Sequence, residues 1–247
     1  MNVLSCPRVL LLFLAIPLVL GGCSVASTVR PESYYDGVRA ASLDRDEPVS
    51  LFPGDASVLT DDAIRRILDY RYAPPTLSRI ALMPAGRQMW SGWSEGLAVA
   101  TEQLERDVVE VLEASPRVYD AAFLPSVLTP ERRSVPHLRE AAARFQADLM
   151  FVYRSFCRSF QKYRVFRDNR ARAFCGVEAV LIDTRTGVVP LSAVASRTFD
   201  VEQSAGDLNF RETVLKAQLA AVAGSLSEVV SDVVDLLEAQ QDSGEPG

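Results

Sequence analysis

The sequence has little of the material from which most catalytic and metal-binding sites are made. Among 247 residues there are one histidine and four cysteines, and no glycine-rich loop of the kind that holds phosphate groups. A single apolar run is long, and no second one reaches the length that a membrane-spanning helix needs. The net charge is −6, which disfavours general binding to nucleic acid. We therefore expect no metal ion and no cofactor.

The one long apolar run is Val9–Leu20, which two glycines and Cys23 follow. Arg8 precedes it, and small residues flank the cysteine, in the order of a bacterial secretory signal. Twelve apolar residues are too few for a permanent membrane span. The segment resembles a bacterial lipobox, which implies removal of residues 1–22 and acylation of Cys23. The alternative is an ordinary secretory signal with a chance cysteine.

By this resemblance, acyl chains on Cys23 anchor the protein in a membrane. Ser24 follows the cysteine, where lipoproteins kept in the inner membrane often carry aspartate, so the resemblance implies the outer membrane and a domain facing the periplasm. Without residues 1–22, 25 basic and 32 acidic residues remain, a net charge of −7. The expected compartment is oxidising.

Composition divides the rest of the chain into a tether, a short helix with a linker, one domain and a tail. Residues 23–59 are polar with little periodicity and are expected to form a flexible tether. Residues 60–77 begin with Thr60 as the N-cap of a short helix. Residues 78–240 suffice for one α/β domain, and 241–247 are expected to be disordered. The short helix carries one apolar stripe: Ile64, Ile67 and Leu68.

Within residues 78–240, the hydrophobic periodicity predicts strands and helices that alternate and then a run of three strands. The expected strands are 80–83, 118–124, 147–163, 171–184 and 188–201. The expected helices are 95–114, 135–145 and 208–238. In the first of these helices, the side chains expected to face the core are Leu97, Leu104, Val108, Val111 and Leu112. This order predicts an α/β two-layer sandwich, with a mixed sheet of about five strands, helices mainly on one face and a long C-terminal helix.

The stretch Gly176–Val189, which reads GVEAVLIDTRTGVV, resembles the strand, Asp-Thr-x-Thr-Gly turn and strand of the curli secretion-channel lipoprotein family. The same anticodon-binding-domain-like α/β sandwich occurs in outer-membrane lipoproteins that activate peptidoglycan synthases and in the N-terminal domain of the Tol-system propeller protein. The resemblance covers about residues 78–238. It implies the fold and two competing roles, a monomeric accessory or a subunit of a ring-shaped secretion channel. A channel needs amphipathic strand pairs, and the single long hairpin has arginine on both strands, which favours the accessory.

Cys157 and Cys175 lie nine residues on either side of Phe166. A hairpin that turns near Phe166 therefore places the two cysteines opposite each other, within cross-strand distance. We predict a disulfide between them. The alternative is two small buried residues on neighbouring strands that stay reduced.

The same hairpin concentrates positive charge, with seven basic residues and one acid between positions 154 and 172, a local charge of +6. Basic and aromatic residues alternate at the even positions of its first strand. One interpretation is a solvated edge whose charges discourage aggregation. The other is a docking surface for an anionic partner, namely an acidic periplasmic protein, lipid phosphates or peptidoglycan carboxylates. The candidate partner-binding residues are Arg154, Arg158, Lys162, Arg164, Arg167, Arg170 and Arg172.

Two tryptophans, Trp90 and Trp93, lie in the long loop that follows the first expected strand. Loops of this kind often hold binding residues, so the pair is a second candidate for partner contact. The alternative is that both rings fold back on the sheet as a lid over the core.

The segment Gly92-Trp93-Ser94-Glu95-Gly96 matches the G-x-S-x-G pattern of a hydrolase nucleophile. A serine hydrolase is nevertheless a remote alternative, because the preceding strand ends about ten residues too early and the only histidine, His137, opens a predicted helix. Ser94 is more simply the N-cap of the 95–114 helix. We expect no catalytic residue, and the sequence favours a non-enzymatic binding or assembly module of the cell envelope.

Overall fold

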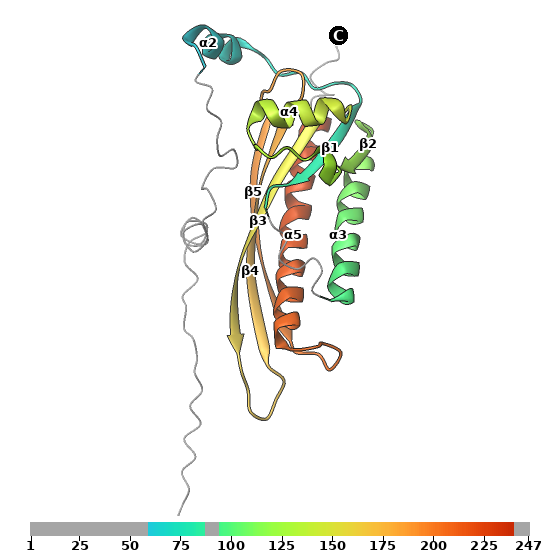
Figure 1. The fold of residues 1–247 in the computed structure, drawn as a ribbon, viewed down its shortest axis with the longest axis vertical. Helices are drawn as coiled ribbons and strands as arrows, with labels where there is room; N and C mark the ends of the chain where they lie inside the picture. Colours follow the sequence, from blue (N-terminus) through green and yellow to red (C-terminus); the bar gives the residue numbers. More distant parts are fainter. Residues whose placement is uncertain (1–58, 87–93, 240–247) are drawn as a thin grey trace, which may run out of the picture.

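Five strands form one sheet in the order β2-β1-β3-β4-β5 (Figure 1). The computed structural model describes residues 59–86 and 94–239. β1 runs parallel to β2 and β3, whereas β3, β4 and β5 form an antiparallel meander. The sheet is therefore mixed, as the sequence predicts. The strands are β1 (Ser78–Pro84), β2 (Val118–Phe123), β3 (Leu149–Lys162), β4 (Arg170–Asp183) and β5 (Leu191–Glu202).

The predicted N-caps define where two helices begin. The hydroxyl of Thr60 accepts a hydrogen bond from the Ala63 backbone at 3.2 Å, and that of Ser94 accepts one from Leu97 at 3.3 Å. Within the described residues, no helix combines the length and the hydropathy of a membrane span. The helices are α2 (Asp61–Asp69), α3 (Glu95–Glu113), the short 3-10 helix η1 (Ser126–Leu128), α4 (Val135–Arg144) and α5 (Phe210–Ala239).

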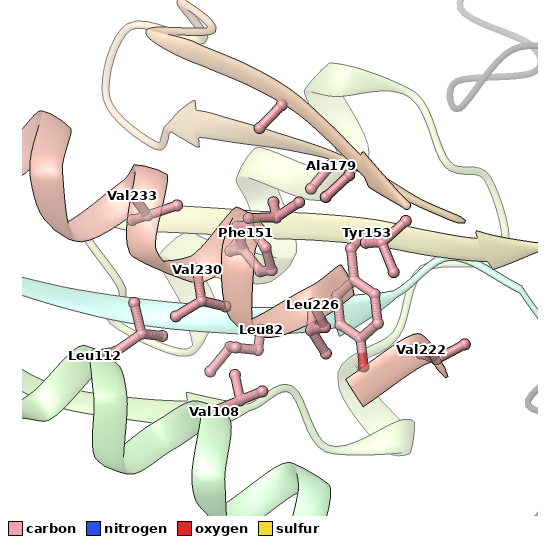
Figure 2. Packing of buried hydrophobic residues seen from close by; sticks show 14 of the residues in the cluster. Leu82, Val108, Leu112, Phe151, Tyr153, Ala179, Val222, Leu226, Val230 and Val233 are labelled. Carbon is pink, nitrogen blue, oxygen red and sulfur yellow. The ribbon is translucent and has the colours of Figure 1, made fainter. Parts of the chain in front are cut away.

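The larger core lies between the sheet and the two long helices α3 and α5 (Figure 1). Odd-numbered residues of β3 point to this side because side chains alternate along a strand. Figure 2 shows Phe151 and Tyr153 packed against α5, with Leu82 of β1 between α5 and α3. The apolar stripe of α5 is buried here, including Leu226 and Val233, which have no exposed surface.

A second core lies on the opposite face, where α4 covers one end of the sheet. Leu138 and Ala142 of α4 pack against Met150 and Val152, the even-numbered residues of β3. The two long helices share one face as predicted, while α4 takes the other. As a result, the first five residues of β3 are buried on both sides, and the strand becomes half-buried beyond Tyr153.

One side chain expected to face the core differs from the structure. Val111 is exposed, because Val108 and Leu112 define the inward face of α3 and Val111 lies at its flank. The apolar stripe of α2 forms, but no residue of this helix is buried. The side chain of Ser134 bonds the ring Nδ1 of His137 at 2.6 Å and makes no hydrogen bond to the backbone at the start of α4.

Candidate docking surface on the sheet

The β3–β4 hairpin carries the predicted disulfide. Cys157 lies directly opposite Cys175 in the ladder, and their sulfur atoms are joined. Cys175 is fully buried, and the Ser225 hydroxyl of α5 donates a hydrogen bond to its backbone carbonyl at 3.1 Å. The two cysteines therefore tie the strands together on the face that α5 covers.

Beyond α4, none of the helices in residues 59–86 and 94–239 covers the even-numbered face of β3, β4 and β5. On β3 the residues of this face alternate in type, as Arg154, Phe156, Arg158, Phe160 and Lys162. The ladder brings two further members from β4 beside them, because Phe174 is opposite Arg158 and Arg172 is opposite Phe160. We call this surface the Arg–Phe face: Arg154, Phe156, Arg158, Phe160, Lys162, Arg172 and Phe174.

Aromatic rings and cations alternate on the Arg–Phe face both along and across the strands. Phe174 lies opposite Arg158, between the positions of Phe156 and Phe160 on the neighbouring strand. Since diagonal neighbours on one face of a sheet are within reach of aromatic side chains, the register places the three phenylalanines close enough to contact one another, with a cation among them. The face therefore offers apolar contact and positive charge together.

Gly176 makes room for one of these rings. A Cβ atom at this position would lie 2.2 Å from the Cζ atom of Phe156, far inside van der Waals contact. The ring of Phe156 consequently lies over the glycine backbone of β4. This packing fixes one end of the aromatic cluster next to the ion pair of Arg154.

Acidic residues of β4 and β5 neutralise much of the positive charge that the sequence concentrates in the hairpin. The Arg154 guanidinium is 2.7 Å from Glu178, and both side chains are largely shielded from solvent. Arg172 lies 2.6 Å from Asp200 of β5, and its hydrogen bond to this carboxylate raises its pKa. The local excess of +6 is thus a count along one segment, and the folded surface is less positive.

Glu202 of β5 pairs with two more of the candidate residues. It forms an ion pair with Arg170, the residue opposite it in the ladder, and lies 3.7 Å from Arg164. Among the residues described by the structure, Lys162 and Arg167 have no ion pair. These two cations carry the uncompensated charge at the end of the hairpin.

The acids Glu178, Asp200 and Glu202 were missed in the reading of the sequence, although a signal for them exists. Centring the β4–β5 connection on Thr186 aligns Arg172 with Asp200 and Arg170 with Glu202. The same count of positions that paired the cysteines would have paired these charges. Glu178 is opposite Arg154 in the hairpin centred on Phe166, so the alignment that pairs the cysteines also pairs these two charges, whereas Asp200 and Glu202 need the second hairpin as well.

Ser94 has a structural role in its surroundings. Its hydroxyl accepts from the Leu97 backbone and donates to the Glu212 carboxylate at 2.8 Å. The backbone N–H of Leu208 and the Ser94 hydroxyl, together with Lys216, lower the pKa of Glu212. A carboxylate so strongly supplied with donors is a poor acceptor for the serine proton.

His137, the histidine that a hydrolase mechanism would require, lies in the first turn of α4. This helix packs on the face of the sheet opposite to the helices that Ser94 and Glu212 belong to. The serine and the histidine therefore do not form a catalytic pair. Within the described residues, no three histidine, cysteine or acidic side chains converge as metal ligands would.

Three of the predicted site residues lie outside the described residues: Cys23, Trp90 and Trp93. Acylation of Cys23 and partner contact by the two tryptophans stay predictions from the sequence.

Comparison with known proteins identifies no family for this chain. No family model matches the chain, and no curated protein matches it. A hypothetical protein from Chlamydia trachomatis has 12% sequence identity and a TM-score of 0.38, with 66% of this chain and 99% of that chain covered. The PelC dodecamer from Paraburkholderia phytofirmans has 17% identity and a TM-score of 0.35, with 67% and 93% covered.

A third solved structure is the lipoprotein GNA1162 from Neisseria meningitidis, with 14% identity and a TM-score of 0.29 over 66% of this chain and 99% of that chain. These three TM-scores are all below 0.5, so the function of this protein is argued from its own residues. Its own strands and helices make it an α/β sandwich with a mixed sheet, and in the β3–β5 half none of the described helices covers one of the two faces.

Proposed function

We propose that the protein is an outer-membrane lipoprotein that faces the periplasm and acts as a non-enzymatic binding and assembly module. Residues 1–22 are its signal peptide, the acyl chains on Cys23 are its anchor, and residues 23–59 are its tether. The support for the anchor is the lipobox-like sequence that ends at Cys23. The observation that carries the binding role is the Arg–Phe face, a surface of alternating cations and rings that none of the described helices covers.

The composition of this face suits an acidic protein partner. Arginine and aromatic residues are enriched at protein interfaces, because they combine large apolar contact area with directional hydrogen bonds. Arg158 and Lys162 lie beside Phe160 on the same strand face, so a partner carboxylate and a partner apolar side chain can be bound next to each other. Positive charge on a protein of net charge −6 also orients an approaching acidic partner toward this face.

A crosslinking experiment in the envelope of the source bacterium tests this role. A photoreactive amino acid at Thr198, an exposed β5 residue opposite Phe174, lies beside the Arg–Phe face. The double variant Arg158→Glu with Lys162→Glu is compared with Arg106→Glu, which reverses an exposed charge on α3, on the other side of the sheet. We expect the first variant to remove the crosslinked product and the second to leave it unchanged.

Equal crosslinking in both variants would contradict binding through the Arg–Phe face. Co-sedimentation of the protein with purified peptidoglycan is the second arm of this experiment. If the double variant loses sedimentation with peptidoglycan and no protein is crosslinked, the anionic partner is the cell wall.

The alternative role, a subunit of a ring-shaped secretion channel, requires the β3–β4 hairpin to enter a membrane. In the structure α5 covers the other face of this hairpin, and the Gln218 amide of α5 donates a hydrogen bond to Ser159 at 2.7 Å. The hairpin would have to leave the sheet, which argues against the channel. Light scattering of the acylated protein extracted in detergent separates the roles, since a monomer or dimer fits the module and a large ring fits the channel.

A further inference from the structure

One end of the molecule exposes large apolar side chains from two connections, the β3–β4 turn and the β5–α5 loop (Figure 1). Tyr163 is 72% exposed, Val165 89% and Phe166 96% in the turn, and Leu208 is 74% exposed in the loop. The ring of Tyr163 meets that of Phe210, the first residue of α5, at 5.2 Å between centroids, which brings the two connections together. We call these residues the apolar tip: Tyr163, Val165, Phe166 and Leu208.

The turn that displays the apolar tip is held in shape by Asn169. Its side-chain oxygen accepts a hydrogen bond from the Arg164 backbone at 2.9 Å, and its amide donates to Gln203 at 2.8 Å. The Gln203 backbone donates in return to the Asn169 carbonyl. Below the turn, the Cys157–Cys175 disulfide joins the two strands. Val165 and Phe166 are thus presented outward by a turn whose backbone is hydrogen-bonded on both sides.

Cations surround the apolar tip. Lys162, Arg164, Arg167 and Arg170 lie in or next to the β3–β4 turn, with the acids Asp168 and Glu202 beside them. At the β5–α5 loop, the acids Asp207 and Glu212 are both paired with Lys216. In the described part of the chain, neither Lys162 nor Arg167 has an ion pair. The end of the molecule is therefore positive, opposite in sign to the chain as a whole.

We propose that the apolar tip inserts into the headgroup layer of an anionic phospholipid bilayer. Val165 and Phe166 enter the boundary between headgroups and acyl chains, where apolar and aromatic side chains are favoured. Lys162 and Arg167 contact lipid phosphates, as cations flanking a membrane-inserted segment do. The turn is far too short to span the bilayer, so the contact is interfacial.

The observations favour a lipid surface over a pocket on a partner protein. The tip is a protruding turn whose apolar side chains are ringed by charges of one predominant sign, and a fluid interface accepts such a shape without a matching cavity. The proposed anchor permits the contact, since the 36 residues from Ser24 to Leu59 reach about 120 Å at full extension. The tether can therefore reach further than the length of the hairpin, because the 14 residues of β3 span only about 46 Å.

The contact goes beyond the proposed function, because it requires no partner on the Arg–Phe face. Its test uses the full acylated protein in vesicles of phosphatidylcholine with phosphatidylglycerol, with lipid in large excess. An environment-sensitive fluorophore is attached to a new cysteine in Val165→Cys, and lipids carrying a quencher report insertion. Cys157 and Cys175 are joined to each other and do not compete for the label.

The matched control is Val127→Cys, a valine of η1 that is 87% exposed. It follows β2, whose last residue Phe123 pairs with Leu82, and Leu82 in turn pairs with Phe151. The control site therefore follows a strand that ends level with Phe151, whereas the tip begins at Tyr163, 12 residues further along the chain. The two variants share the same membrane anchor, so a difference between their labels reports insertion of the tip.

We expect the label at position 165 to be quenched and shifted to the blue, and the label at 127 to be unaffected. Adding Lys162→Glu and Arg167→Glu should lower the ratio of inserted to free tips by about tenfold or more, because each cation near an anionic surface contributes on the order of a tenfold change or somewhat less. Equal quenching at the two positions, or no quenching at 165, would overturn the proposal. The tip would then be expected to bind in a pocket of a partner protein. Flotation of the protein with the vesicles measures the anchor separately, so failure of the Cys23 prediction is recognised on its own.

Discussion

Removing the Cys157–Cys175 disulfide should destabilise the domain by a predictable amount. The bond closes a loop of 18 residues, and the loss of chain entropy in the unfolded state for such a loop corresponds to about 3 kcal/mol at 25 °C. The double variant Cys157→Ala with Cys175→Ala keeps small apolar side chains at both positions, including the fully buried one. We therefore expect the free energy of unfolding to fall by about 3 kcal/mol. For a domain of this size, the melting temperature should fall by roughly 6–12 °C.

The assay is urea unfolding of the chain from Ser24 onward, followed by circular dichroism, with the wild-type protein measured oxidised and reduced. Reduced wild type and the double variant should unfold at the same urea concentration, because both lack the crosslink and their packing is nearly the same. The slope of the free energy against urea concentration should rise in both, since the unfolded state without the crosslink exposes more surface. The reasoning would be refuted if the free energy of unfolding of the double variant were within about 1 kcal/mol of that of the oxidised wild type. It would also be refuted if reduced and oxidised wild type unfolded at the same urea concentration.

Three further predictions concern the core, the glycine of the Arg–Phe face and the start of α5. Leu226→Ala, at a fully buried position, should lower the free energy of unfolding by about 2–5 kcal/mol in the same urea assay. Gly176→Ala should cost only about 1 kcal/mol, because the end of the Phe156 ring can swing away, yet the displaced ring should reduce crosslinking at the Arg–Phe face; unchanged crosslinking would contradict the assigned packing. Glu212 has a folded pKa below its ordinary value of 4.5, so its stabilising contribution is full above that pH and is lost as the pH falls through the folded pKa. The melting temperature of Glu212→Gln should therefore be lower than that of wild type at pH 7, and the difference should shrink as the pH falls below 4.5. A difference that does not change with pH would show that the hydrogen bonds from Leu208 and Ser94 do not stabilise the protein through the charge of Glu212.

The alignment of the hairpin could be predicted because it depends on counting residues. Two cysteines equidistant from Phe166 are opposite each other in any hairpin centred there, and the ladder of the structure has this register. Helix starts were predictable for a similar reason, since Thr60 and Ser94 each precede an apolar stripe and carry a hydroxyl that accepts an orphan backbone N–H.

The position of α4 was not predictable in the same way. A helical stripe such as Leu138 and Ala142 shows which side of the helix is buried, and it does not say which face of the sheet covers it. The run of apolar residues at the start of β3 is the only hint, because a strand buried on both faces loses its alternation. The net charge of the hairpin does not follow from the hairpin alone, because Asp200 and Glu202 belong to β5 and pair with it only through the β4–β5 register.

The change along β3, from both faces covered to one, has a consequence for the local opening of the molecule. Backbone amides between Leu149 and Tyr153 lie under two layers of side chains, so their hydrogen exchange should require unfolding of the whole domain. Amides near Lys162 lie at the uncovered end and should exchange through small fluctuations that leave the core intact. The disulfide at Cys157 stands between these regions and holds the two strands together when the outer ladder opens. The distal hairpin can therefore adapt its shape at a surface without loosening the part of the sheet that stabilises the fold.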